Sequence, residues 1–287
     1  MERSLDDIQP VDSKQYKAEN IDRDQFKVFF TSCEDMTEIP DNSIHLCFTS
    51  PPYFLMRGTV PYDSYKDYLK TMYQILKEMY RTLKPGRSMM INISDYQVSA
   101  QLDEEIVKGT DIELGSKYDC PSHFSYLLYK LNQQHGGKHE LKYKDTIVWV
   151  KSGSTSQRAG TFVSSGNPLK YAPEEVTERI LVFQKGEKDY EKIWKEKRSS
   201  DKYSDVDLSS YEKFEEWASI DVESMRDYIQ NVWEIQPETQ SDHPAPFPPK
   251  LPEVAIKLYS LERELVLDPF LGSATTLERA QALDRRG

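Results

Sequence analysis

The sequence has few cysteines, a deficit of positive charge and no long hydrophobic run. Cys33, Cys47 and Cys120 are widely spaced and odd in number, which excludes a disulfide framework and a zinc ligand set and predicts a reducing, cytoplasmic setting. No apolar stretch approaches the roughly 18 residues of a membrane span, and the polar start is no secretory signal. The 37 basic and 48 acidic side chains give a net charge of −11, which argues against a coat-like nucleic-acid binder.

The 287 residues, 38% hydrophobic and 30% charged, suit one large globular domain or two small ones. Apolar positions in 65–83 step by three and four residues, which predicts an amphipathic helix that stops at Pro85-Gly86. Because short β-rich runs flank this helix, 44–94 is expected to be a βαβ unit of a parallel sheet. We expect further strands at 26–30, 145–151, 179–185 and 264–270, and helices at 122–134, at 253–261 and after 276.

The segment Thr-Ser-Pro-Pro-Tyr (49–53) follows one of these strands. Two prolines hold the backbone extended and remove two N–H donors, so the segment offers carbonyl acceptors, the Ser50 hydroxyl and the Tyr53 ring. Ligands of open α/β sheets lie at the carboxyl ends of the strands. The pattern fits a site for a planar amine such as a nucleobase, or a strand that simply ends in a proline turn.

The segment LDPFLGSATT (267–276) joins an apolar strand to a helix through an acidic residue and small residues. Gly272 permits close approach of the backbone, and a helix start attracts anionic groups. The segment is either a nucleotide-type site or an ordinary β–α turn. The dinucleotide fingerprint GxGxxG is absent. A third segment, HPAPFPP (243–249), reads on its own as a linker or a polyproline ligand.

Together these segments resemble one family, the β-group DNA amino-methyltransferases. TSPPY, KPG, GNP…ILVFQKG, HPAPFPPKLPE and DPFLGSATT occur in the family's order from about residue 28 to 287. In this family TSPPY is the motif on the side of the target base and DPFLGSATT is the cofactor motif. Here TSPPY comes first, whereas in protein-glutamine methyltransferases the cofactor motif comes first. The resemblance implies a Rossmann-like class I methyltransferase α/β fold, with helices on both faces of a mostly parallel sheet and circularly permuted motifs.

The resemblance also implies S-adenosylmethionine as cofactor, double-stranded DNA as substrate and cytosine N4 or adenine N6 as target, with cytosine favoured. A restriction endonuclease that acts on the same site is a candidate partner. The cysteine spacing and the lack of a long apolar run predict no metal and no membrane contact. The residues implied to be catalytic are Ser50, Pro51, Pro52 and Tyr53. Those implied to bind the cofactor are Asp268, Pro269, Phe270, Gly272, Ser273, His243, Pro244 and Phe247. Candidate DNA contacts are Arg158, Lys170, Lys195 and Arg198.

The polar composition of 1–24 predicts a mobile arm. By the resemblance, 25–185 is the base-side half of the domain, 186–235 a target-recognition insertion and 236–287 the cofactor segment. The sequence departs from the family pattern at Ala274, where a glycine is usual, and at Ser32, where an acid is common. It ends directly after the last expected helix, before the strand whose acidic end would hold the cofactor ribose. We therefore expect an incomplete cofactor site. The alternatives are a small-molecule or RNA amino-methyltransferase and an inactive DNA-binding relative.

Overall fold

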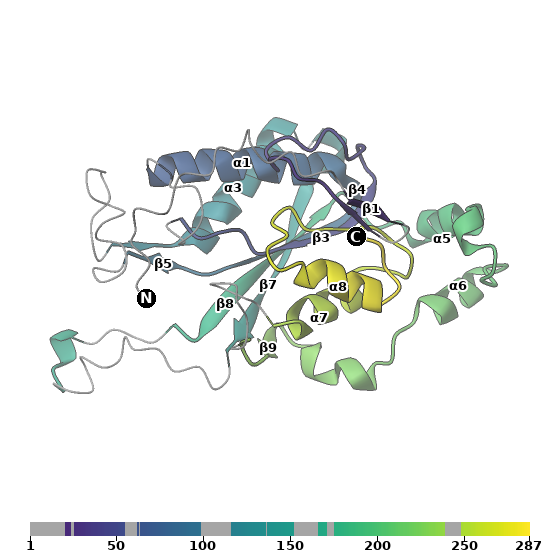
Figure 1. The fold of residues 1–287 in the computed structure, drawn as a ribbon. Coiled ribbons are helices and arrows are strands. Elements are labelled where there is room, and N and C mark those ends of the chain that lie inside the picture. Colours follow the sequence, from purple (N-terminus) through teal and green to yellow (C-terminus); the bar gives the residue numbers. More distant parts are fainter. Residues whose placement is uncertain are drawn as a thin grey trace, which may run out of the picture.

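A six-stranded sheet organises the fold, with strand order β10-β3-β4-β8-β7-β9 (Figure 1). The computed structural model describes residues 21–23, 26–54, 62, 64–98, 116–135, 137–151, 166–170, 175–238 and 248–287. Within this part of the chain no helix is both long and apolar enough to cross a membrane.

One half of the sheet is parallel. Strand β3 (Ile44–Thr49), helix α1 (Tyr65–Thr82) and strand β4 (Leu83–Ile93) form the predicted βαβ unit, and β10 (Val266–Leu267) pairs parallel with the other side of β3. The carboxyl ends of these three strands therefore meet at one edge of the sheet. This edge collects the segments that follow each strand.

The other half of the sheet contains reversed strands. Strand β8 (Thr177–Lys185) runs antiparallel to both β4 and β7 (Leu141–Val150), while β9 (Val232–Glu234) pairs parallel with β7. The sheet is therefore mixed, with three parallel and two antiparallel pairs. Since β8 starts where β4 ends, the first residues of β8 lie at the edge that carries the carboxyl ends.

Alternating side chains of the strands feed two apolar cores, one on each face of the sheet. Helices α1 and α3 (Cys120–His135) cover the face that receives Cys47, Met89 and Leu181. Helices α7 (Lys250–Tyr259) and α8 (Thr275–Ala282) lie on the other face, with Leu46 and Phe48 (Figure 1). Helices on both faces, as expected, leave the ends of the strands as the place for chemistry.

Several boundaries differ from the expected ones. Strand β4 already begins at Leu83 and includes Pro85 and Gly86, where the sequence predicted only the end of the helix. Gly86 has a φ of 79°, a conformation that glycine adopts without strain. Of the expected strand 264–270 only Val266–Leu267 forms β10. Residues Ile21–Arg23, at the end of the segment predicted to be an arm, form β1, which pairs with β2 (Phe26–Val28). Residues 1–20 lie outside the described part.

Short elements complete the fold. Strands β5 (Tyr96–Gln97) and β6 (Lys117–Tyr118) pair antiparallel beyond the carboxyl end of β4, and Arg286 forms an isolated parallel bridge with Leu265. The 3-10 helices are η2 (Gly137–His139), η4 (Pro168–Lys170), η5 (Asp201–Tyr203) and η6 (Glu223–Tyr228).

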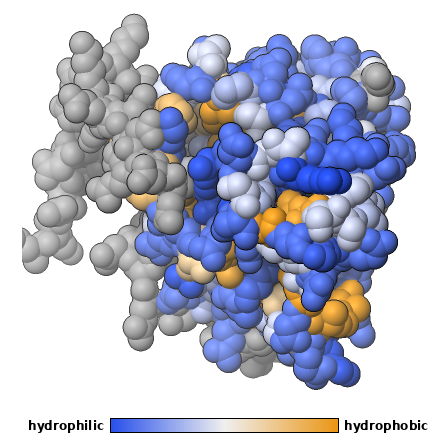
Figure 2. All heavy atoms as spheres, turned by 90° about the vertical axis from the view of Figure 1, so that its right-hand side faces the viewer, coloured by the Kyte–Doolittle hydropathy of each residue, from blue (hydrophilic) through white to orange (hydrophobic). Residues whose placement is uncertain are grey.

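The segment 186–235 contains α5 (Tyr190–Arg198), η5, α6 (Tyr211–Ala218), η6 and β9. Tyr203, Leu208 and Phe214 form a small apolar core of their own between its helices. Figure 1 shows α5 and α6 on the side of the sheet opposite β5, at the end where β4 and β10 begin. Figure 2 views this side, which is mainly hydrophilic with small separate hydrophobic areas.

A buried ion cluster attaches this segment to the sheet. The Glu264 side chain, 0% exposed, contacts the Arg87 guanidinium and lies 2.8 Å from Lys197 Nζ on α5. Burial lowers the pKa of the nearby His45 to about 3, so this ring stays neutral. One carboxylate therefore compensates two buried cations from separate elements.

We expect Glu264→Ala to lower the free energy of unfolding by about 3–5 kcal/mol, because Arg87 and Lys197 would remain buried without their counter-charge. The measurement is urea denaturation of the purified protein. Glu253→Ala is the matched control, since Glu253 on α7 pairs with Lys250 and Lys257 near the surface and should cost less than about 1 kcal/mol. Equal losses in the two variants would contradict this role of Glu264.

Candidate active site

The carboxylate of Asp268 joins the two segments singled out in the sequence. Asp268 follows β10, and its Oδ1 accepts a hydrogen bond of 2.6 Å from the hydroxyl of Thr49 at the end of β3. Its Oδ2 accepts one of 2.7 Å from the hydroxyl of Thr276 on α8, and the amide of Phe270 donates to Oδ1 at 3.1 Å. The carboxylate thus fixes the loop after β10 against the strand that leads into Ser50.

Burial sets the charge state of this carboxyl. It raises the pKa of Asp268 to about 6, while the hydrogen bonds from Thr49, Thr276 and the Phe270 amide oppose this rise. At neutral pH the group is therefore mainly ionised, held by three donors in place of water.

The loop after Asp268 turns through left-handed backbone before α8 begins. Gly272 has a φ of 51°, and Ala274, at the N-cap of α8, has a φ of 63°. A left-handed conformation costs an L-residue about 1–2 kcal/mol, which gives a physical reason for glycine at this position in the family pattern. Despite its Cβ, Ala274 adopts the turn, with its amide donating to the Leu271 carbonyl at 2.7 Å.

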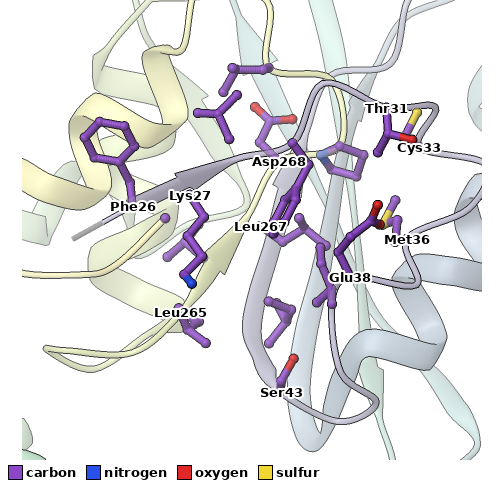
Figure 3. Close-up of a pocket in the computed structure, with 18 of the residues that line it drawn as sticks. Phe26, Lys27, Thr31, Cys33, Met36, Glu38, Ser43, Leu265, Leu267 and Asp268 are labelled. Carbon is purple, nitrogen blue, oxygen red and sulfur yellow. The ribbon is translucent and has the colours of Figure 1, made fainter. Parts of the chain in front are cut away.

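A cavity of about 570 Å³ opens beside this loop. One wall comes from β2 and the following loop through Ser43, and the other from 265–269, with lining side chains that are largely apolar. Figure 3 shows Asp268 at one end of the cavity and Ser43 at the other, with Thr31 and Cys33 near the Asp268 end. A cavity of this size falls in the range that binds small molecules.

The Thr-Ser-Pro-Pro-Tyr segment is anchored by aromatic contacts. Phe54, 0% exposed, packs edge-on against Tyr65 with ring centroids 5.1 Å apart. The hydroxyl of Tyr68 donates to the Pro52 carbonyl at 3.0 Å. The Tyr53 ring stacks on Tyr96 of β5, with centroids 6.1 Å apart and planes 29° from parallel. These contacts fix the Tyr53 ring beside the half-buried Ser50.

Three residues of this edge were missed in the sequence: Asn92 at the end of β4, Tyr96 and Glu178 at the start of β8. The Asn92 amide lies 3.4 Å from Ser50 Oγ and 2.6 Å from a carboxylate oxygen of Glu178. A polar residue at the end of an apolar strand was the available signal for Asn92. The antiparallel pairing that brings Glu178 to the same edge had no counterpart in the sequence pattern.

The other residues predicted to contact the cofactor or DNA lie outside the described residues or on helices. His243, Pro244, Phe247 and Arg158 lie outside the described residues, and Lys170 ends η4. Lys195 on α5 pairs with Glu191 at 2.8 Å, and the Arg198 guanidinium lies 5.6 Å from the Trp194 ring centroid.

Helix α5 lies toward the other end of β4 from Ser50. Its Glu196 pairs with Lys84 at the start of β4, whereas Asn92, next to Ser50, lies near the end of that strand. Contact of α5 with DNA stays a prediction.

All three cysteines are described, and Cys33 lines the cavity. Cys33, Cys47 and Cys120 are free thiols, and burial raises the pKa of Cys33 to about 11. No group of three or more His, Cys, Asp or Glu side chains within the described ranges is arranged to hold a metal ion.

The sheet with helices on both faces is the Rossmann-like α/β fold that the sequence predicted. Residues 44–287 match the family described as DNA methylase. The chain belongs to this family. The sequence had already indicated the same family from TSPPY and DPFLGSATT.

Among curated relatives, the type II methyltransferase M.MjaI of Methanocaldococcus jannaschii is 28% identical over 297 residues, covering 90% of this chain and 84% of that protein. The type II beta methyltransferase M.BslI of Bacillus sp. strain NEB-606 is 26% identical over 265 residues, or 89% of this chain. The chain spans only 25% of the length of M.BslI.

Solved structures share the fold. The cytosine-N4-specific PvuII DNA methyltransferase superposes with a TM-score of 0.60 at 19% identity, covering 91% of this chain and 80% of that one. The DNA modification methylase TTHA0409 of Thermus thermophilus, complexed with S-adenosyl-L-methionine, gives 0.57 at 22% identity over 86% of this chain and 80% of its own.

We expect Asp268→Asn to remove a pH dependence of stability. Because the native pKa of about 6 exceeds the unfolded value near 3.9, the folded state binds this proton more tightly. The resulting stabilisation is complete below about pH 3 and is lost as pH rises through 6. The parent's free energy of unfolding relative to the variant should therefore fall by about 2 kcal/mol between pH 4 and 7.

The measurement is urea denaturation at several pH values. Asp205→Asn is the control, because Arg263 lowers the pKa of Asp205 to about 2 and its titration lies below this range. A difference between parent and Asp268→Asn that stays constant from pH 4 to 7 would contradict the buried, raised-pKa carboxyl.

Proposed function

We propose that this protein transfers a methyl group from S-adenosylmethionine to N4 of a cytosine flipped out of double-stranded DNA. The observation that carries the proposal is the hydrogen bond of 2.6 Å between Thr49 and Asp268. It joins the strand that ends in Ser50 to the loop expected to hold the cofactor. A methyl donor and an amine bound at these two segments would therefore lie side by side.

The residues beside Asp268 suit the cofactor. The cavity is large enough for a small molecule, and Asp268 lies at its end next to the loop (Figure 3). When bound, S-adenosylmethionine supplies an electrophilic methyl group on a sulfonium. We infer that Pro269, Phe270, Gly272 and Ser273 hold it together with Asp268. In this proposal His243, Pro244 and Phe247 lie beside its methionine end.

Ser50 and Tyr53 would bind the target base. Flipping a base out of the stack costs a few kcal/mol, and stacking on an aromatic ring returns about 1–3 kcal/mol. The Tyr53 ring, already fixed by Tyr96, provides this surface. The Ser50 hydroxyl and the Pro51 carbonyl would accept the N–H groups of the amine and turn its lone pair toward the methyl group. Orientation and fixed dipoles are then the main catalytic contributions.

Cytosine N4 is favoured over adenine N6 on two grounds. The motif begins with serine and the third segment reads HPAPFP, a combination that leans toward cytosine in the family that the sequence resembles. The PvuII enzyme, which shares the fold, is cytosine-N4-specific. Adenine N6 remains the second candidate, because enzymes with the same four residues, Ser-Pro-Pro-Tyr, also act on adenine.

We further propose that local cations meet the DNA despite the net charge of −11, with Arg158, Lys170, Lys195 and Arg198 as candidates. A chain that modifies duplex DNA would work in the cytoplasm. The type II names of the relatives support a restriction endonuclease for the same site as partner.

We expect incubation of the protein with S-adenosylmethionine and duplex DNA to yield N4-methylcytosine, identified by mass spectrometry of the digested nucleosides. Ser50→Ala should lower the single-turnover rate about tenfold to a hundredfold, because one hydrogen bond to a group that gains charge is lost. N6-methyladenine as sole product would overturn the choice of base. Methylation of RNA alone, or of neither nucleic acid, would overturn the proposed function.

A further inference from the structure

One buried carboxylate lies behind both side chains of the proposed base site. Glu178, at the start of β8, has a side chain 8% exposed. Its Oε2 accepts a hydrogen bond of 2.6 Å from the Asn92 amide, and it also bonds the hydroxyl of Tyr53. Its Oε1 lies 2.5 Å from Lys151 Nζ, directly after β7. Three other segments of the chain therefore converge on this side chain.

Glu178 fixes the orientation of the Asn92 amide. Only the NH₂ group of the amide can face a carboxylate, since the amide oxygen would be repelled. The same nitrogen lies 3.4 Å from Ser50 Oγ, so Ser50 faces a donor. Of the two lone pairs of its hydroxyl oxygen, one is turned toward Asn92 and the other stays available for the amine of a target base. Glu178 thereby sets, through Asn92, what Ser50 can accept.

Glu178 also fixes the Tyr53 ring. Burial, the Glu178 charge and the hydrogen bond to Glu178 raise the pKa of Tyr53 well above its ordinary value, so the phenol stays protonated and donates. With its hydroxyl held by Glu178 and its face stacked on Tyr96, the ring is restrained in two directions. A restrained ring loses less conformational entropy when a base stacks on it.

Lys151 allows the carboxylate to remain ionised in this position. A buried carboxylate without a counter-charge is strongly unfavourable, and a buried pair is tolerated when its other oxygen is also satisfied by donors. Lys151 neutralises Oε1 while Asn92 occupies Oε2. The Glu178–Lys151 pair has no net charge, and its effect on the site is to hold Asn92 in place.

We propose that Glu178 is a positioning residue for methyl transfer: it holds Asn92 and Tyr53 from behind and so orients the Ser50 hydroxyl and the Tyr53 ring toward the target base. The inference rests on the proposed function in that it takes Ser50 and Tyr53 as the groups that contact the base. It adds a residue from β8, about 125 residues away in sequence, to that site.

The first test is the single-turnover rate of methyl transfer by Glu178→Gln, with the affinity for S-adenosylmethionine measured by calorimetry. We expect the rate to fall about tenfold to a hundredfold, the loss typical of charged hydrogen bonds, and the affinity to change less than about twofold. Glu187→Gln is the matched control, because Glu187 forms a glutamate–lysine pair with Lys142 just beyond the other end of β8. It should leave both quantities unchanged.

A double-mutant cycle separates positioning from general support of the fold. If Glu178 acts through Asn92 and Tyr53, Glu178→Gln should cost less than about threefold in a protein that already carries Asn92→Ala and Tyr53→Phe. Losses that multiply in the cycle, or an equal loss of cofactor affinity, would overturn the proposal. If Glu178→Gln does not fold cooperatively, Tyr53→Phe alone decides, since it removes only the hydroxyl that reaches Glu178. An unchanged rate in that variant counts against the inference.

The parent protein distinguishes this inference from the proposed function. A parent that transfers no methyl group to DNA contradicts the proposed function. A parent that methylates DNA but is indifferent to Glu178→Gln contradicts only the role of Glu178.

Discussion

The joining of the two segments depends on one carboxylate, that of Asp268 at the end of the cavity. Its bonds to Thr49 and Thr276 tie the end of β3 to the start of α8, and its bond from the Phe270 amide shapes the loop between them. Thr49 and Asp268 are 219 residues apart in sequence. Because all of these groups donate to one acceptor, the arrangement tolerates little displacement. Two segments that are distant in sequence therefore lie together at the end of the sheet.

The strands of the sheet bring the site residues to one end of the sheet, and the segment with α5 and α6 lies at the opposite end. The parallel strands β10, β3 and β4 deliver Asp268, Ser50 and Asn92 to the same edge, while the reversed strand β8 brings Glu178 there with its first residues. The segment with α5 and α6 is fixed instead at the other end of the strands, through the Glu264 cluster. The buried carboxylates thus have separate tasks: Asp268 joins the proposed cofactor and base segments, and Glu264 attaches a peripheral segment.

Many elements of the fold and the two motif segments could be predicted from the sequence. The features that could not be predicted depend on contacts between distant parts of the chain. The βαβ unit, the helices α1 and α3 and the family followed from periodicity and from TSPPY and DPFLGSATT, because these patterns are local. The early start of β4 was hidden by Pro85-Gly86, which reads as a break although Gly86 adopts a positive φ within the strand. Asn92 and Glu178 were not predicted as site residues, because their roles depend on the pairing of β4 with β8. Tyr96 was not predicted either, because its contact with Tyr53 depends on tertiary packing.

The most direct test is a crystal structure of the protein with an unreactive S-adenosylmethionine analogue and duplex DNA that contains the target base. The account predicts that the analogue contacts the loop 268–273 and that the flipped base stacks on Tyr53. The exocyclic nitrogen should lie within hydrogen-bonding distance of Ser50 Oγ and about 3–3.5 Å from the position of the methyl group. An analogue bound away from Asp268, or a base whose amine does not reach Ser50, would contradict it.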